Sequence, residues 1–113
     1  MTFKELQNKI NNTLISQNED MVEIPTLGAR VQNQLNPSYI RVFTDGDLVC
    51  FHNQGGNRFS FDEKLYEIIL NRWNELGEDL KLRSGQYTDP IFIGGNRVLN
   101  PYVATIVAEY IEN

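Results

Sequence analysis

The chain has little sulfur and imidazole chemistry: one cysteine, Cys50, and one histidine, His52, among 113 residues. A single cysteine excludes an internal disulfide and a structural zinc site built from cysteines. A single histidine excludes a metal site built from several histidines of one chain. We therefore expect no metal site and no cofactor, and we expect a reducing compartment.

Long apolar runs are also missing. Residues 1–6 form no apolar stretch of signal-peptide length, and no run elsewhere approaches the roughly 20 apolar residues of a membrane span. From these two observations we expect a cytoplasmic protein with no membrane contact.

Basic residues are few and scattered. Ten lysines and arginines stand against fifteen acids, which gives a net charge of −5. A duplex-DNA binder needs clustered bases to displace counterions from the phosphates, so nucleic acid is a disfavoured partner, although charge alone does not eliminate it. The acids form no long block, and their excess favours solubility and a partner with a basic surface.

Apolar residues, in contrast, are sufficient for one core. They make up 41% of the chain and include one Trp, five Tyr and six Phe. A chain of this length is too short for two independent cores. We therefore predict a single domain over residues 1–113.

Two segments have helical periodicity and a capping residue. Thr2 can cap a helix over residues 2–17 with Glu5 reaching back, and Asp62 can cap a second helix over residues 62–76. Their apolar residues recur at helical spacing: Leu6, Ile10 and Leu14 in the first, and Leu65, Ile69, Trp73 and Leu76 in the second.

A third helix is expected after Asn100–Pro101, where a capping asparagine precedes a proline in the first helical position. The residues it would bury are Val103, Ile106, Val107, Tyr110 and Ile111. Short strands are expected near residues 22–24, 80–83 and 91–93, and a polar loop over 84–90. The rest of segment 19–37 stays open between loop, strand and helical turn.

The clearest signal is a β-hairpin. Two β-rich runs, 39–44 and 48–53, flank Asp45-Gly46-Asp47, and Asp-Gly suits a type I′ turn. With Asp45-Gly46 as the loop, one apolar face pairs Val42 with Val49 and Ile40 with Phe51. The residues of the opposite, partly solvent-facing side are Tyr39, Arg41, Cys50 and His52.

After the hairpin, Phe59 and Phe61 have two alternative positions that depend on the length of the connection. They lie either on the face of Phe51 or beside His52; we favour the first, because two phenylalanines seldom sit exposed together.

Hairpins without a parallel crossover indicate an α+β fold. We predict an antiparallel sheet of about four to six strands, with an N-terminal, a central and a C-terminal helix packed mainly on one face.

The tetrapeptide Gly-Gly-Asn-Arg occurs twice, at residues 55–58 and 94–97. Glycine N–H groups with Arg58 and Arg97 could bind phosphate or another acidic group. Two β-turns that need residues tolerant of positive φ explain the pattern more simply, and we favour that interpretation.

His52 and Cys50 could form a nucleophilic pair, but side-by-side strand residues without an oxyanion element do not make one. We interpret His52 as a strand residue stacked on Tyr39, and Asp45 and Asp47 as turn acids, because the rest of a calcium loop is missing. The sequence therefore predicts no catalytic residue.

The favoured function is a small acidic, non-enzymatic interaction domain that binds another protein as an accessory, inhibitor or assembly factor. Tyrosine and arginine are typical of protein-binding surfaces. The expected binding residues are Tyr39, Arg41, His52, Arg58, Tyr87 and Arg97. The alternative is a phosphate-ligand or nucleic-acid module that uses the two Gly-Gly-Asn-Arg turns, and a homodimer stays open.

Overall fold

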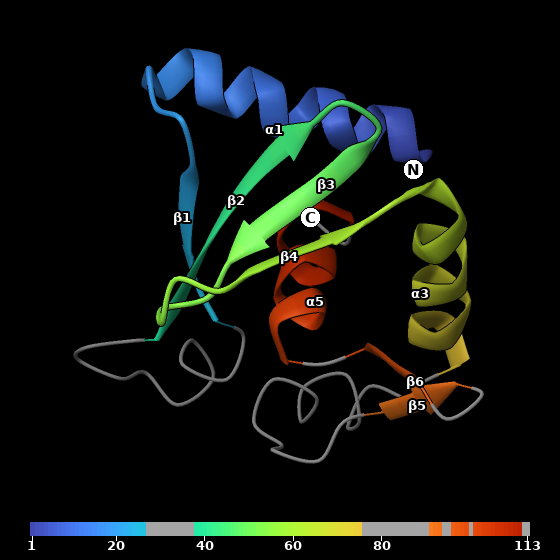
Figure 1. Cartoon of the computed structure of the whole chain (residues 1–113). Helices are drawn as coiled ribbons and strands as arrows, with labels where there is room; N and C mark the ends of the chain where they lie inside the picture. Colours follow the sequence, from blue (N-terminus) through green and yellow to red (C-terminus); the bar gives the residue numbers. More distant parts are fainter. Residues whose placement is uncertain (27–37, 76–90, 94–95, 100, 112–113) are drawn as a thin grey trace.

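A helix, a four-stranded antiparallel sheet and two further helical segments make up the fold in the computed structural model (Figure 1), which confirms the predicted α+β class. The structure describes residues 1–26, 38–75, 91–93, 96–99 and 101–111, with only the backbone for 91–101. The elements are α1 (Phe3–Gln17), β1 (Val22–Pro25), β2 (Tyr39–Asp45), β3 (Leu48–His52), β4 (Arg58–Phe61), α3 (Glu63–Glu75), β5 (Ile91–Ile93), β6 (Asn96–Leu99), α5 (Pro101–Ile106) and the π-helix η1 (Val107–Ile111).

The main sheet has the order β1-β2-β3-β4, and β5 and β6 form a separate two-stranded sheet. Alternate residues along the main sheet are buried: Val22, Ile24, Ile40, Val42, Val49, Phe51 and Phe61. This face packs with residues of the helices into one hydrophobic cluster. In Figure 1 the strands β3 and β4 pass in front of α5, so the core lies behind the sheet in that view.

Helix α1 begins with the capping box predicted from the sequence. The Thr2 hydroxyl accepts a hydrogen bond from the Glu5 N–H at 3.1 Å, and the Glu5 carboxylate accepts one from the Thr2 N–H at 3.0 Å. Phe3, Leu6 and Ile10 are buried on one side of the helix. The sequence therefore determines both where α1 begins and which side it buries.

Helix α3 begins after Asp62, whose carboxylate accepts a hydrogen bond from the Leu65 N–H at 2.9 Å. The predicted buried stripe is partly wrong, because Tyr66 lies in the core and Leu65 is only partly buried. The Phe3 ring lies 5.4 Å from the Tyr66 ring, and the Tyr66 hydroxyl donates to the carbonyl of Met1. Contacts with α1 thus draw Tyr66 inward. Ile69 and Trp73 are buried as predicted, and residue 76 lies outside the described residues.

The C-terminal helix starts at Pro101 and changes after Ile106 into the π-helix η1. Four of the five residues predicted as buried are in the core, and Ile111 is partly buried and packs against it. The Lys9 ammonium of α1 donates to the Tyr110 carbonyl at 3.0 Å, which ties the two ends of the described chain together. Apolar spacing does not distinguish a π-helix from an α-helix, so the change was not predicted.

The β2–β3 hairpin is present, but the predicted register is wrong. The loop is Gly46-Asp47, so that Asp45 pairs with Leu48 and Val42 with Phe51. Gly46 has φ +57° whereas Asp47 is not among the residues with positive φ. A two-residue loop with glycine first is typical of a type II′ turn rather than the expected type I′ turn.

Strand β4 places Phe59 opposite Phe51 and Phe61 opposite Val49, which confirms that both lie on the core face. The connection is longer than expected, because residues 53–57 separate β3 from β4. Phe61 is buried, while Phe59 is 42% exposed and stacks on Phe51 at 5.3 Å. Phe59 therefore sits at the margin of the core.

Farther along the chain, the strand predicted at residues 91–93 is confirmed as β5. Residues 96–99, expected only as a turn leading to a helix, form β6, which pairs with β5. The strand expected at 80–83 and the loop expected at 84–90 lie outside the described residues.

Candidate functional site: the open face of the main sheet

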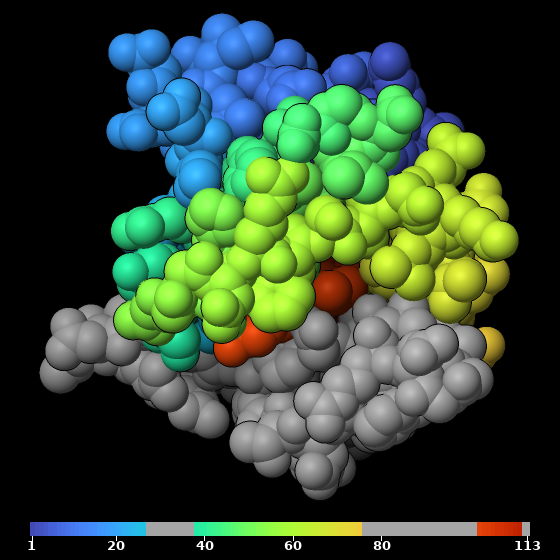
Figure 2. All heavy atoms as spheres, viewed as in Figure 1, coloured from blue at the N-terminus to red at the C-terminus, as the bar shows by residue number. Residues whose placement is uncertain are grey.

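The side of the main sheet opposite the core carries polar and aromatic residues, and we call it the open face. Alternation along the paired strands places these side chains there: Glu23, Tyr39, Arg41, Phe43, Asp45, Cys50, His52, Arg58 and Ser60. In Figure 2 the atoms of β2 to β4, green to yellow-green, lie in front of the C-terminal helix. The open face therefore faces the reader.

Arg58 organises the centre of this face. Its side chain reaches from β4 across β3 to β2, where Nη2 lies 2.7 Å from the carboxylate of Asp45. The same Nη2 atom lies 3.5 Å from the Cys50 sulfur, and the guanidinium carbon lies 5.2 Å from the centre of the Phe43 ring. One arginine thus contacts three residues of two other strands.

Cys50 is fully buried beneath this arginine, although the sequence suggested only a half-buried position. Burial raises the pKa of the Cys50 thiol, while the charge of Arg58 and its hydrogen bond oppose that change. Because the thiolate is the nucleophilic form, a raised pKa and full burial make this thiol unreactive.

His52 contacts Phe43 and not Tyr39, which corrects the expected stacking. The two rings meet edge to face with their centres 5.2 Å apart. The reason is the changed register, which sets His52 opposite Arg41 and moves Tyr39 out to the pair with Pro25.

Tyr39 and Arg41 form a second group on the open face. The Arg41 guanidinium lies 5.1 Å from the centre of the Tyr39 ring, and its Nε lies 3.5 Å from the Glu23 carboxylate. Both charged side chains are at least half exposed, so this ion pair contributes little to stability, typically less than about 1 kcal/mol. Its effect is to orient Arg41 along the surface.

Beside this group is an open hollow of about 590 Å³ between the end of α1 and the start of β1. Its lining consists of Gln17, Glu19, Asp20, Met21, Glu23 and Arg41. Three of these six residues are acids, so this margin of the open face is negatively charged.

The structure brings together four of the six predicted binding residues: Tyr39, Arg41, His52 and Arg58 share the open face. Arg97 belongs to β6 in the other sheet, where only the backbone is described, and residue 87 lies outside the described residues. Two participants were missed as site residues, Phe43 and Asp45. Strand alternation places Phe43 with Tyr39 and Arg41, whereas the reach of Arg58 to Asp45 has no signal in the sequence.

The first Gly-Gly-Asn-Arg forms a turn. The Gly56 N–H donates to the Asn53 carbonyl at 3.0 Å, and the Asn57 N–H donates to the Asn53 side chain at 2.9 Å. Gly56 has φ +84°, a conformation that favours glycine. Two of the N–H groups that could have bound an anion are thus used within the turn itself. In the second copy, residues 94–95 lie outside the described residues.

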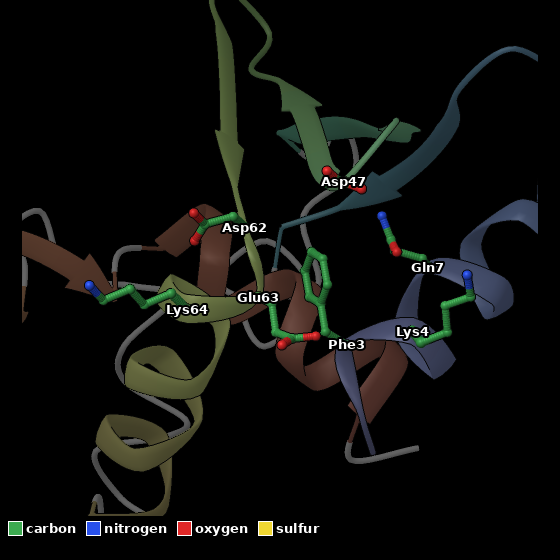
Figure 3. Close-up of a pocket in the computed structure, with 7 residues that line it drawn as sticks. All are labelled: Phe3, Lys4, Gln7, Asp47, Asp62, Glu63 and Lys64. Atoms are coloured by element: carbon green, nitrogen blue, oxygen red, sulfur yellow. The ribbon is translucent and has the colours of Figure 1, made fainter.

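A second hollow, of about 530 Å³, lies where the first turns of α1 and α3 meet the β2–β3 loop (Figure 3). Its residues are Phe3, Lys4, Gln7, Asp47, Asp62, Glu63 and Lys64. The Gln7 amide donates to the Gly46 carbonyl at 3.0 Å, and Asp62 caps α3. In Figure 3, Lys4 and Lys64 lie on opposite sides of Phe3, so the two cations do not converge on one ligand.

Two further observations concern only the residues that the structure describes. Over these ranges, no three side chains of His, Cys, Asp or Glu form a group that could hold a metal ion. Nor is any helix within them long and apolar enough to cross a membrane. Comparison with known proteins gives no match to a family model, to a curated protein or to a solved structure.

Proposed function

We propose that the protein is a small, non-enzymatic interaction domain that binds another protein through the open face of its main sheet. One observation carries this proposal: Tyr39, Arg41, Phe43, His52 and Arg58 share one accessible face. Tyrosine, phenylalanine and arginine are enriched in the buried centres of protein interfaces.

The contacts within this face support binding. Arg58 is held by Asp45 and Phe43, and Arg41 by Tyr39 and Glu23. Side chains that are already restrained lose less conformational entropy when a partner covers them. A preorganised set of arginines and aromatic rings is therefore a favourable binding surface.

The charge distribution indicates the chemistry of the partner. The acidic hollow that contains Glu19, Asp20 and Glu23 adjoins the open face at Arg41. A partner that places a lysine or arginine there would meet complementary charge, which favours association rate and specificity. We therefore propose a partner with a basic surface beside an apolar contact region.

The test begins by isolating proteins that co-purify with the native chain and identifying them by mass spectrometry. The dissociation constant of the purified pair is then measured for the native chain and for the double variant Tyr39→Ala with Arg41→Ala. We expect the variant to weaken binding by at least about tenfold, because each hot-spot residue contributes about 1–2 kcal/mol or more.

A matched control uses the exposed face of the helices, where Asn12→Ala with Glu67→Ala removes two exposed side chains. The control should bind like the native chain. Equal affinities for all three proteins would contradict binding through the open face. Binding that falls steeply with salt and is lost with Arg58→Ala plus Arg97→Ala would instead support a phosphate or nucleic-acid ligand.

A further inference from the structure

The two edges of the main sheet differ in how they could accept another strand. β1 forms one edge and β4 the other. An unprotected edge carries unpaired N–H and C=O groups that can bind a further strand. At the β1 edge, Pro25 has no N–H to donate, and proline is a common device that blocks such edges.

The direction of each N–H in β4 follows from the loop before it. The Asn53 N–H donates to the Asn57 carbonyl at 3.1 Å, which shows that the backbone N–H of Asn53 points toward the chain that leads into β4. This single bond has the position of a hydrogen-bonded pair in the β3–β4 ladder. Antiparallel pairs alternate, and the next hydrogen-bonded pairs are therefore Phe51 with Phe59 and Val49 with Phe61. The N–H and C=O groups of Arg58 and Ser60 consequently point away from β3.

The same alternation of hydrogen-bonded pairs can be extended across β3 and β2 to β1, where it agrees with the observed hydrogen bonds. The Thr26 N–H donates to the Ser38 carbonyl at 2.9 Å, as the pattern requires, and residues 23 and 25 of β1 then point outward. The outward positions of the two edges are thus Arg58 and Ser60 in β4, and Glu23 and Pro25 in β1.

We propose that a second copy of this chain adds to the sheet at β4, by antiparallel pairing of β4 with β4 of its partner. The outward residues Arg58 and Ser60 are separated by one residue, Phe59. A two-fold axis through Phe59 therefore pairs Arg58 of each copy with Ser60 of the other copy. Every outward N–H then meets an outward C=O in two mutually hydrogen-bonded pairs. Backbone pairing alone would accept any antiparallel strand, so the choice of a second copy rests on Phe59, which is 42% exposed beside this edge.

Phe59 supports the same register. It lies on the axis, so the two Phe59 residues face each other in a non-hydrogen-bonded pair, where Cβ atoms are about 4.5–5.5 Å apart. Phe59 is 42% exposed although its ring stacks on that of Phe51 in the core. Pairing would cover this surface in both protomers and would join the two sheets with their open faces on the same side.

The experiment measures molecular mass by sedimentation equilibrium, for the native chain and two proline variants, from about 10 µM to about 1 mM. Ser60→Pro removes an outward N–H from β4 and leaves the β3 ladder intact, because proline is tolerated at such edge positions. Glu23→Pro makes the same change at β1. We expect a reversible dimer for the native chain and for Glu23→Pro, and a monomer for Ser60→Pro.

Disulfide trapping tests the register independently. Under mild oxidation, Phe59→Cys should yield a covalent dimer, because the two introduced thiols face each other across the axis. In Asn57→Cys the thiols would be four residues out of register, about 13 Å apart, which is beyond the reach of a disulfide. Native Cys50 is fully buried and should not react.

A native chain that stays monomeric at about 1 mM would overturn the proposal, as would a Ser60→Pro variant that still dimerises. If Ser60→Pro does not fold, the trapping pair decides, and equal cross-linking of Phe59→Cys and Asn57→Cys would refute the register. This inference does not depend on the proposed function: Tyr39→Ala with Arg41→Ala should leave the dimer intact even where it weakens partner binding.

Discussion

At the scale of single residues, Arg58 has the largest influence on the open face. Its guanidinium pairs with Asp45, packs on Phe43 and covers the sulfur of Cys50. The planar guanidinium can make an ion pair at its edge while its face stacks on a ring, which a lysine ammonium cannot reproduce. A single side chain thereby links three strands on the exposed side of the sheet.

Arg58→Ala should make Cys50 accessible to a thiol reagent such as 5,5′-dithiobis(2-nitrobenzoate). In the native protein the reaction should be slow, because the sulfur is fully buried and burial raises the pKa of the thiol. We expect an acceleration on the order of tenfold in the variant, since thiol reactivity follows access and thiolate content.

Arg41→Ala is the matched control, because it removes an arginine from the same face without a contact to Cys50. Its reaction rate should equal that of the native protein. An unchanged rate in Arg58→Ala would show that Phe43 and the neighbouring strands alone exclude the reagent.

At the scale of elements, the two copies of Gly-Gly-Asn-Arg both lie between paired strands. The first copy connects β3 with β4 and precedes α3; the second connects β5 with β6 and precedes α5. In both, the strand that begins within the tetrapeptide pairs antiparallel with the strand before it. The registers differ, because Arg58 is the first paired residue of β4 whereas Asn96 is the first of β6, so the recurrence does not correspond to one common turn.

The two glycines of the first copy should respond differently to alanine. Gly56 has φ +84°, so Gly56→Ala should lower the free energy of unfolding by about 1 kcal/mol. At Gly55, whose φ is not in the left-handed region, an added Cβ meets its nearest atom at an ordinary 3.5 Å. Gly55→Ala should therefore be neutral within about 0.5 kcal/mol.

Urea unfolding followed by circular dichroism measures both free energies. If the two variants lost equal amounts of unfolding free energy, the glycines would matter for a reason other than backbone conformation, such as close approach of a ligand.

The hairpin shows why an element can be predicted while its register is not. A loop at Asp45-Gly46 pairs Val42 with Val49, whereas the observed loop at Gly46-Asp47 pairs Val42 with Phe51. The partner of each residue therefore shifts by two positions along the opposite strand. Because the side-chain period of a strand is two, both registers leave Val42, Val49 and Phe51 on the core face. Burial therefore does not choose between them, and the backbone conformation of Gly46 does.

At the scale of the whole molecule, one core joins segments from both ends of the chain. Buried residues of α1, the main sheet, α3 and the C-terminal helices belong to the same cluster. Two hydrogen bonds also join these segments. The Tyr66 hydroxyl donates to the Met1 carbonyl, and the Lys9 ammonium donates to the Tyr110 carbonyl. We therefore expect the domain to unfold in one cooperative step.

Leu6→Ala tests this expectation. Leu6 is fully buried, so its truncation should cost about 2–5 kcal/mol. Trp73, the only tryptophan, lies in another helix and is 2% exposed. Its fluorescence and the far-ultraviolet circular dichroism should report the same lowered transition midpoint.

Ile15→Ala provides the control in the same helix, because Ile15 is 78% exposed. It should change stability by no more than about 0.5 kcal/mol. If Leu6→Ala shifted the circular dichroism transition but left the Trp73 transition in place, α1 would be a separate folding unit.

The sequence by itself determined the helix starts at Thr2 and Asp62, the buried sides of α1 and the sheet, and the α+β class. These features depend on residues within about four positions of each other: a cap and the N–H it accepts from, or alternation along one strand. Three binding candidates, Tyr39, Arg41 and His52, could be placed on one face for the same reason, whereas the structure added Arg58 to them.

Only the tertiary structure decided the hairpin register, the burial of Tyr66, the contact between His52 and Phe43, and the position of Arg58 over Cys50. Each depends on which strand or helix lies opposite and how far a long side chain reaches across it. Those distances arise from packing between segments remote in the chain, and no local pattern encodes them.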